Sequence, residues 1–106
     1  MSTSWIYLIA AILFEVSGTT CMKLSEGFTK LVPSVLIFVF YGLCFSFLTL
    51  ALKRLEVSVA YSVWAGLGTV LIAIIGIIWF RESATSIKLL SIALIIMGVI
   101  GINASE

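Results

Sequence analysis

Residues 33–52 read PSVLIFVFYGLCFSFLTLAL, a run of twenty residues without a charged side chain. The hydrocarbon core of a bilayer is about 30 Å thick, and a helix needs roughly 20 apolar residues to cross it. Pro33 is well suited to the first position of a helix, where its missing N–H costs no hydrogen bond. This stretch therefore predicts a membrane-spanning helix.

Three more apolar stretches of similar length occur along the chain: 58–80 is also uncharged, 4–22 contains Glu15, and 87–104 has Lys88 at its edge. The short polar segments 23–30, 53–56 and 81–86 connect the four stretches. The sequence predicts an all-α membrane protein with four transmembrane helices in one domain, residues 1–106. No connecting segment is long enough to fold outside the membrane, so any chemistry should take place within the bilayer.

The composition supports a membrane protein and excludes several other classes. The chain is 62% hydrophobic and 10% charged, whereas soluble domains are about 25% charged. A net charge of +1 without a basic patch argues against nucleic-acid binding. There is no His, and Cys21 and Cys44 lie in separate apolar stretches, so we expect small buried side chains rather than a disulfide, metal site or cofactor. The first apolar stretch has no preceding Lys or Arg and contains Glu15, so we do not expect a cleaved signal peptide.

The distribution of basic residues gives only a weak orientation signal. With four spans, both termini and the segment 53–56 share one side of the membrane. The basic residues divide as follows: Lys53 and Arg54 on that side, and Lys23, Lys30, Arg81 and Lys88 on the other. Either the bias is simply small, or the chain inserts in both orientations.

Glu15 is the only acid or base well inside any predicted span. A charged side chain near the bilayer centre costs about 2.5–3.5 kcal/mol on insertion scales. A residue kept at this cost indicates a functional site. The alternative interpretation is a protonated carboxyl that hydrogen-bonds a neighbouring helix and stabilises packing.

Helical spacing predicts which residues share the Glu15 face. At intervals of three, four and seven positions these are Leu8, Ala11, Ile12, Gly18 and Thr19. Ala11 and Gly18 are small and leave room beside the carboxylate, and Thr19 can donate a hydrogen bond to it.

Aromatic residues on two other spans complete the candidate site. Tyr61 and Trp64 are three residues apart on the third span, and Tyr41 and Phe45 are four apart on the second. Together with one central carboxylate they indicate an aromatic-lined anionic pocket for a lipophilic cation.

The buried carboxyl group can also bind a proton, because burial disfavours its charged form. Proton and cation would then exclude each other at one site, which is the simplest exchanger. Alternating-access carriers combine two inverted repeats, and no repeat is visible within this chain. We therefore expect a second, oppositely inserted copy to complete the transporter.

The sequence resembles the small multidrug resistance family of four-helix bacterial transporters over essentially its whole length. The resemblance is carried by FEVSGTTCMKLSEGFTKLVPS (14–34), AYSVWAGLG (60–68) and GVIGIN (98–103). It implies an antiparallel, dual-topology homodimer in the bacterial plasma (inner) membrane that exchanges protons for hydrophobic organic cations. The run from Gly18 to Lys23 is similar to the quaternary-ammonium, multidrug subtype.

The resemblance also implies roles for individual residues. It implies Glu15 as the essential glutamate, Tyr61 and Trp64 as binding aromatics with Tyr41 and Phe45 as lesser contacts, Gly66 and Gly68 as a hinge, and a dimer contact over residues 91–98 including Ser91 and Gly98. Ser91 replaces a frequent Gly of the family and Ala65 a frequent Ser, so the dimer contact and the substrate preference are open. Some relatives require a paired, non-identical partner.

Three other functions are alternatives to proton-coupled cation export. A guanidinium exporter of the same family is disfavoured by the run Gly18-Thr19-Thr20. A proton-translocating rotor subunit also uses one buried carboxylate, but such subunits are usually two-helix hairpins. A structural membrane module without transport is the third. The sequence contains no nucleophile–base pair or metal set, so we do not expect an enzyme.

Overall fold

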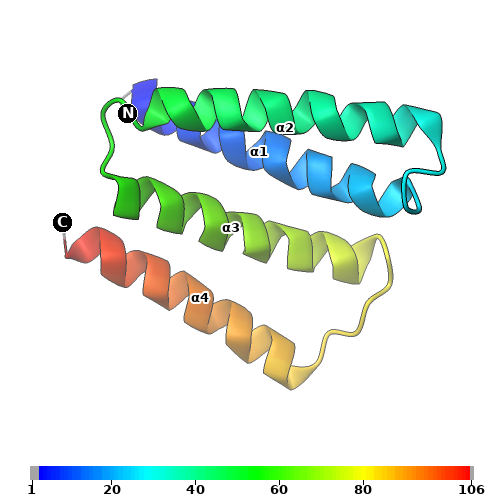
Figure 1. The fold of residues 1–106 in the computed structure, drawn as a ribbon. Coiled ribbons are helices and arrows are strands. Elements are labelled where there is room, and N and C mark those ends of the chain that lie inside the picture. Colours follow the sequence, from blue (N-terminus) through cyan, green and yellow to red (C-terminus); the bar gives the residue numbers. More distant parts are fainter. Residues whose placement is uncertain (1–2, 106) are drawn as a thin grey trace.

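The computed structural model describes residues 3–105 and contains four helices (Figure 1). They are α1 (Thr3–Leu24), α2 (Leu31–Ala51), α3 (Val57–Ile78) and α4 (Ser86–Ala104), with no strand between residues 3 and 105. Each helix is long and apolar enough to cross a membrane. The four-helix, all-α prediction is confirmed, and every helix end lies within two residues of the predicted span.

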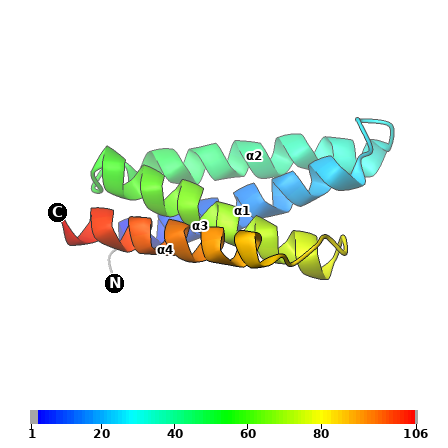
Figure 2. The same cartoon turned by 90° about the horizontal axis from the view of Figure 1, so that it is seen from below.

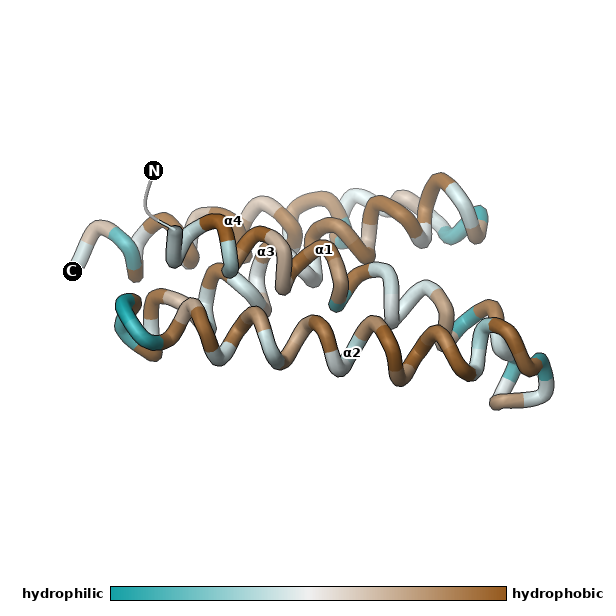
Figure 3. The backbone as a smooth tube through the Cα atoms, turned by 90° about the horizontal axis from the view of Figure 1, so that it is seen from above, coloured by the Kyte–Doolittle hydropathy of each residue, from teal (hydrophilic) through white to brown (hydrophobic). Residues whose placement is uncertain are grey.

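The hydropathy of the folded chain has the layered pattern of a multi-pass membrane protein. Figure 3 shows mainly hydrophobic residues along all four helices, with hydrophilic segments gathered at the two ends of the molecule. Successive helices run in opposite directions, so the loops after α1 and α3 lie at one end and the loop after α2 lies with the chain termini at the other (Figure 1).

The turn between α1 and α2 uses left-handed backbone conformations at three successive residues. Glu26, Gly27 and Phe28 have φ angles of 48°, 73° and 68°, and the buried Ser25 hydroxyl accepts a hydrogen bond from the Phe28 N–H at 3.2 Å. Lys30 forms an exposed ion pair with Glu26 at 2.6 Å. The hydrogen bond and the charge of Lys30 hold the pKa of Glu26 below its ordinary value.

The starts of α2 and α4 show how local chemistry sets the helix ends. We expected Pro33 at the first position of α2, but the helix begins two residues earlier, at Leu31. That prediction was wrong because the whole first turn of a helix has N–H groups without intrahelical acceptors, so proline fits there too. At α4, Thr85 caps the helix start, because its hydroxyl oxygen accepts a hydrogen bond from the Lys88 N–H at 3.1 Å.

The first two helices form the main packing unit. Phe14 on α1 stacks on Phe40 and Phe47 of α2, with ring centroids 6.2 Å and 5.6 Å apart, and Tyr7 lies 5.8 Å from Phe47. On its other side α1 contacts α3. The buried core shared by these helices consists of Leu8, Ile12, Val16, Ala51, Ala60 and Val63.

The fourth helix is the least covered part of the chain. It packs against α3, and none of its residues is buried. Figure 2 shows α1 and α3 crossing, with α4 beside α3. The chain measures 43 × 35 × 19 Å, which is about two helix diameters in the thin direction. A single chain of this shape cannot enclose a central pocket on all sides.

Candidate cation and proton site

The carboxyl group of Glu15 lies in the middle of α1 and is half-buried. Its Oε1 accepts a hydrogen bond from the Thr19 hydroxyl at 3.3 Å, as the helical spacing predicted. Its Oε2 is buried and has no hydrogen-bond partner among residues 3–105. Buried polar atoms are nearly always paired, and an unpaired one is costly. The free oxygen is therefore available to a ligand of Glu15.

The backbone of α3 approaches this free oxygen at Gly68. A Cβ atom added at Gly68 would lie 2.8 Å from Oε2 and 3.5 Å from Cδ of Glu15. Glycine at this position leaves space for the carboxyl group where it lies, and a side chain there would displace the carboxyl end of Glu15. The hinge assigned to Gly66 and Gly68 stays a prediction, since α3 is one continuous helix. Gly66 has a different neighbour, because its Cβ would lie 2.5 Å from Cγ2 of Val99 on α4.

A second hydroxyl group extends the hydrogen-bond chain from Glu15 to α2. The Thr19 and Tyr41 hydroxyl oxygens are 2.5 Å apart. Thr19 has one hydroxyl proton and donates it to Glu15, so Tyr41 donates to Thr19. Gly18 permits this contact, because a Cβ there would lie 2.7 Å from the Tyr41 ring. Tyr41 thus holds Thr19 in position to stabilise the carboxylate.

The structure joins the two predicted aromatic pairs into one continuous row. Ring centroids are 5.9 Å apart for Tyr41 and Phe45, 6.3 Å for Phe45 and Trp64, and 5.4 Å for Trp64 and Tyr61. The Trp64 indole N–H is buried and has no hydrogen-bond partner in the described chain. Beside Glu15 there is therefore a wall of ring faces.

This site is open on one side of the chain. Phe45 is 51% exposed and Tyr61 is 58% exposed. Leu8, Ala11 and Ile12, by contrast, are buried in the core of the single chain, and their contact with a substrate stays a prediction. Ser91 and Gly98 lie exposed on α4, so their dimer contact also stays a prediction.

Sequence reasoning missed the contact of Gly68 with Glu15. Helical spacing carried a signal for it, since Gly68 follows Tyr61 by seven residues and Trp64 by four and so shares their face. Both cysteines, Cys21 and Cys44, are free and buried, as predicted. Within residues 3–105, no three His, Cys, Asp or Glu side chains lie close enough to hold a metal ion.

Comparison with known proteins gives one consistent family. The family model described as Small Multidrug Resistance protein matches residues 3–95. The chain is 54% identical over 103 residues to the uncharacterized membrane protein YvaE of Bacillus subtilis, covering 97% of this chain and 87% of the relative. It is 44% identical to the quaternary ammonium compound-resistance protein QacC of Staphylococcus aureus, covering 93% and 92%. It is 40% identical to the multidrug resistance protein EbrA of Bacillus licheniformis, covering 99% and 100%.

Proposed function

The chain belongs to the small multidrug resistance family, and we propose that it is a proton-coupled antiporter that exports hydrophobic organic cations such as quaternary ammonium compounds. Members of this family are transporters and not enzymes, and the chain is a multi-pass membrane protein. We place it in the bacterial plasma membrane, with one end of its helices facing the cytoplasm.

The observation that carries this proposal is the buried, unpaired Oε2 of Glu15. A bare carboxylate in an apolar environment is costly, and either a proton or a cation removes that cost. Both ligands need the same oxygen, so they exclude each other. A proton gradient can then drive the release of the cation on the side where protons are abundant.

The aromatic row accounts for the substrate class. A hydrophobic cation can place its charge against Glu15 and its apolar groups against Trp64 and Phe45, where cation–π contacts are worth about 0.5–2 kcal/mol each. The relatives' names refer to quaternary ammonium compounds, which supports these substrates over guanidinium. A rotor subunit would have no use for such a row of rings.

A second copy of the chain completes the site in this proposal. Phe45 and Tyr61 are exposed, and α4 has no buried residue. A partner chain would cover these surfaces. Because Glu15 lies near the middle of α1, two chains inserted in opposite orientations place their carboxylates at the same depth. The weak Lys and Arg bias allows both orientations. We therefore propose an antiparallel homodimer, in which Ser91 and Gly98 of α4 contact the partner and Gly66 and Gly68 act as the hinge.

Transport by purified protein in lipid vesicles tests the proposed function. A fluorescent lipophilic cation should accumulate only when a pH gradient is imposed, and a protonophore should abolish the accumulation. Accumulation that ignores the gradient would contradict proton coupling. Absence of transport by the chain alone, with recovery on adding a related chain, would replace the homodimer with a paired complex.

Labelling from each side of the membrane tests the antiparallel arrangement. The probe is Ser105→Cys in a chain whose two cysteines are replaced by alanine. We expect an impermeant maleimide to label about half of the chains from each side in active membranes, as two-orientation insertion requires. Active protein labelled from one side alone would contradict the antiparallel homodimer and leave the chemistry of Glu15 untouched.

A further inference from the structure

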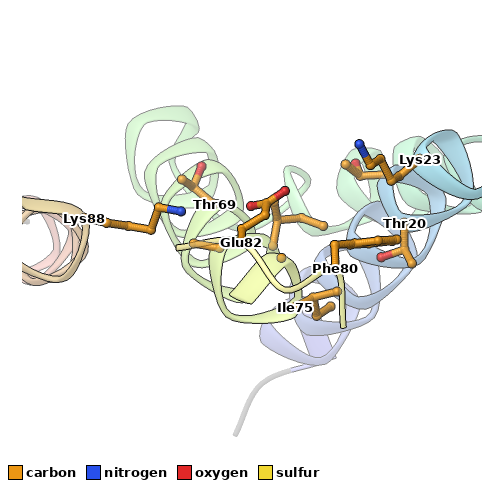
Figure 4. A pocket seen from close by; sticks show the side chains of 11 residues that line it. Thr20, Lys23, Thr69, Ile75, Phe80, Glu82 and Lys88 are labelled. Carbon is orange, nitrogen blue, oxygen red and sulfur yellow. The ribbon is translucent and has the colours of Figure 1, made fainter. Parts of the chain in front are cut away.

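A cavity of about 280 Å³ lies toward the end of the molecule opposite the chain termini, and no ring of the aromatic row lines it. Its walls come from the last turns of α1, the second half of α3, the loop after α3 and the start of α4. Figure 4 shows three charged side chains around it: Lys23 from α1, Glu82 from the loop and Lys88 from α4. This end of the helices lies at the edge of the membrane.

The three charges are not neutralised by ion pairs within the described chain. The one salt bridge found among residues 3–105 joins Lys30 to Glu26, and it leaves Lys23, Glu82 and Lys88 without a partner within 4.0 Å. Opposite charges that face one cavity without contacting each other are available to a ligand that carries both signs.

The backbone fixes the position of Glu82 over the cavity. The Glu82 N–H donates a hydrogen bond to the Gly76 carbonyl at 3.0 Å, and the preceding Arg81 has a left-handed φ of 57°. A Cβ atom at Gly76 would collide with the Glu82 carboxylate. The absence of a side chain at Gly76 therefore lets Glu82 lie against α3. The Thr85 cap fixes the helix start that carries Lys88, another residue of the cavity wall.

The hydroxyl groups of the cavity act as hydrogen-bond acceptors. Thr20 donates its proton to the Val16 carbonyl at 2.9 Å, and Thr69 donates to the Ala65 carbonyl at 2.7 Å. Each hydroxyl oxygen keeps lone pairs, and both residues line the cavity. The site thus offers ammonium donors at two points, and a carboxylate with hydroxyl oxygens as acceptors.

We propose that this cavity binds the headgroup of a membrane phospholipid that carries both a phosphate and a primary amine. Lys23 and Lys88, which lie on either side of Glu82 in Figure 4, donate to the phosphate, as in other lysine–phosphate contacts. The lipid ammonium group donates to Glu82 and Thr69. The apolar wall formed by Ile72, Ile75 and Phe80 suits the glycerol and first acyl carbons of a lipid rather than a free phosphoamine. Thr19 lines this cavity and also donates to Glu15, but the proposed headgroup contacts do not use Thr19. Lipid retention can therefore be measured independently of proton coupling.

Native mass spectrometry of the full-length protein in detergent tests the proposal. The protein is mixed with equal amounts of phosphatidylethanolamine, phosphatidylglycerol and phosphatidylcholine. We expect the wild-type protein to retain the ethanolamine lipid about tenfold better than the other two, the size of one charge-assisted hydrogen bond. Equal retention of the three lipids would overturn the proposal, and so would displacement by an equal amount of soluble glycerophosphoethanolamine.

Charge-neutral variants assign the two halves of the headgroup. Lys23→Gln with Lys88→Gln should lower retention of both phosphatidylethanolamine and phosphatidylglycerol by about tenfold or more. The matched control, Lys53→Gln with Arg54→Gln, removes the same charge at the other end of the helices and should change retention little. An equal loss of lipid retention in the control would show that general electrostatic attraction holds the lipid, and it would overturn the proposed headgroup site.

The role of Glu82 has its own readout. Glu82→Gln should bring the ratio of bound phosphatidylethanolamine to phosphatidylglycerol close to one, while Glu56→Gln should leave that ratio unchanged. Because the ratio is measured within a single variant, it does not depend on the yield of folded protein. A Glu82→Gln protein that keeps the wild-type ratio would refute the contact with the lipid amine.

Discussion

Replacing Gly68 with alanine tests how the site holds its carboxyl group. The new methyl group would lie 2.8 Å from Oε2 of Glu15, whereas ordinary contacts between these atoms begin near 3.4 Å. Glu15 must therefore move away from α3 by roughly half an ångström or more. The Thr19 hydroxyl is already 3.3 Å from Oε1, at the long end of hydrogen-bond distances. We expect the displacement of the carboxyl group to lengthen or break this bond.

The expected loss follows from the interaction that is disturbed. A hydrogen bond to a charged group contributes about 1.5–3 kcal/mol, and its partial loss should weaken cation binding by about five- to tenfold. The helix itself should not suffer, because alanine is about 0.8–1.0 kcal/mol more favourable than glycine inside a helix. Gly68→Ala should thus bind substrate poorly while unfolding at the same temperature or higher.

Isothermal titration with tetraphenylphosphonium in detergent, combined with thermal unfolding, measures both effects. Gly42→Ala is the matched control, since a Cβ at Gly42 has no neighbour within 4 Å. The control should bind like the wild-type protein. A folded Gly68→Ala protein with wild-type affinity would refute the argument that α3 positions the carboxyl group of Glu15.

Three further predictions address the rest of the site and its packing. Trp64→Ala should weaken tetraphenylphosphonium binding by about tenfold or more, as loss of ring contacts to a cation implies, and should affect a methylammonium ligand less; equal losses in titrations of both ligands would count against an aromatic wall. Thr19→Val removes the hydrogen-bond donor to Glu15 and leaves the Tyr41 hydroxyl without its partner. Proton release on cation binding should therefore change its pH dependence. An unchanged pH profile would show that the Thr19–Glu15 bond has no role. Gly66→Ala should lower the free energy of unfolding by about 1–3 kcal/mol, because the added methyl group overpacks the α3–α4 contact. Val99→Ala in the same chain should restore part of this loss in thermal unfolding. Absence of any rescue would mean that a side chain at position 66 does not contact Val99.

Sequence spacing predicted those features that depend on a single helix. Apolar runs of about 20 residues located the four spans, because membrane insertion depends mainly on length and polarity. The spacing of four residues between Glu15 and Thr19 predicted their hydrogen bond, because residues four apart are neighbours on one helix. Glu15 itself stood out because no other acid or base lies well inside a span, away from its ends.

Contacts between helices could not be predicted in this way. The approach of Phe45 to Trp64 and of Gly68 to Glu15 depends on how the helices cross, which the spacing within one helix does not encode. The lipid cavity is a stronger case, because Lys23, Glu82 and Lys88 come from two helices and a loop that meet only in the folded chain. Pro33 shows the same limit at a helix end, where the whole first turn accepts a proline.

Proton release on cation binding tests the central claim most directly. Tetraphenylphosphonium is added to weakly buffered, detergent-solubilised protein over a series of starting pH values, and the pH change is recorded for the wild-type protein and for Glu15→Gln. If proton and cation compete for Oε2 of Glu15, the wild-type protein releases protons at the lower pH values and Glu15→Gln releases none at any pH. Proton release from a folded Glu15→Gln protein, or cation binding by the wild-type protein without release at every pH, would contradict the account.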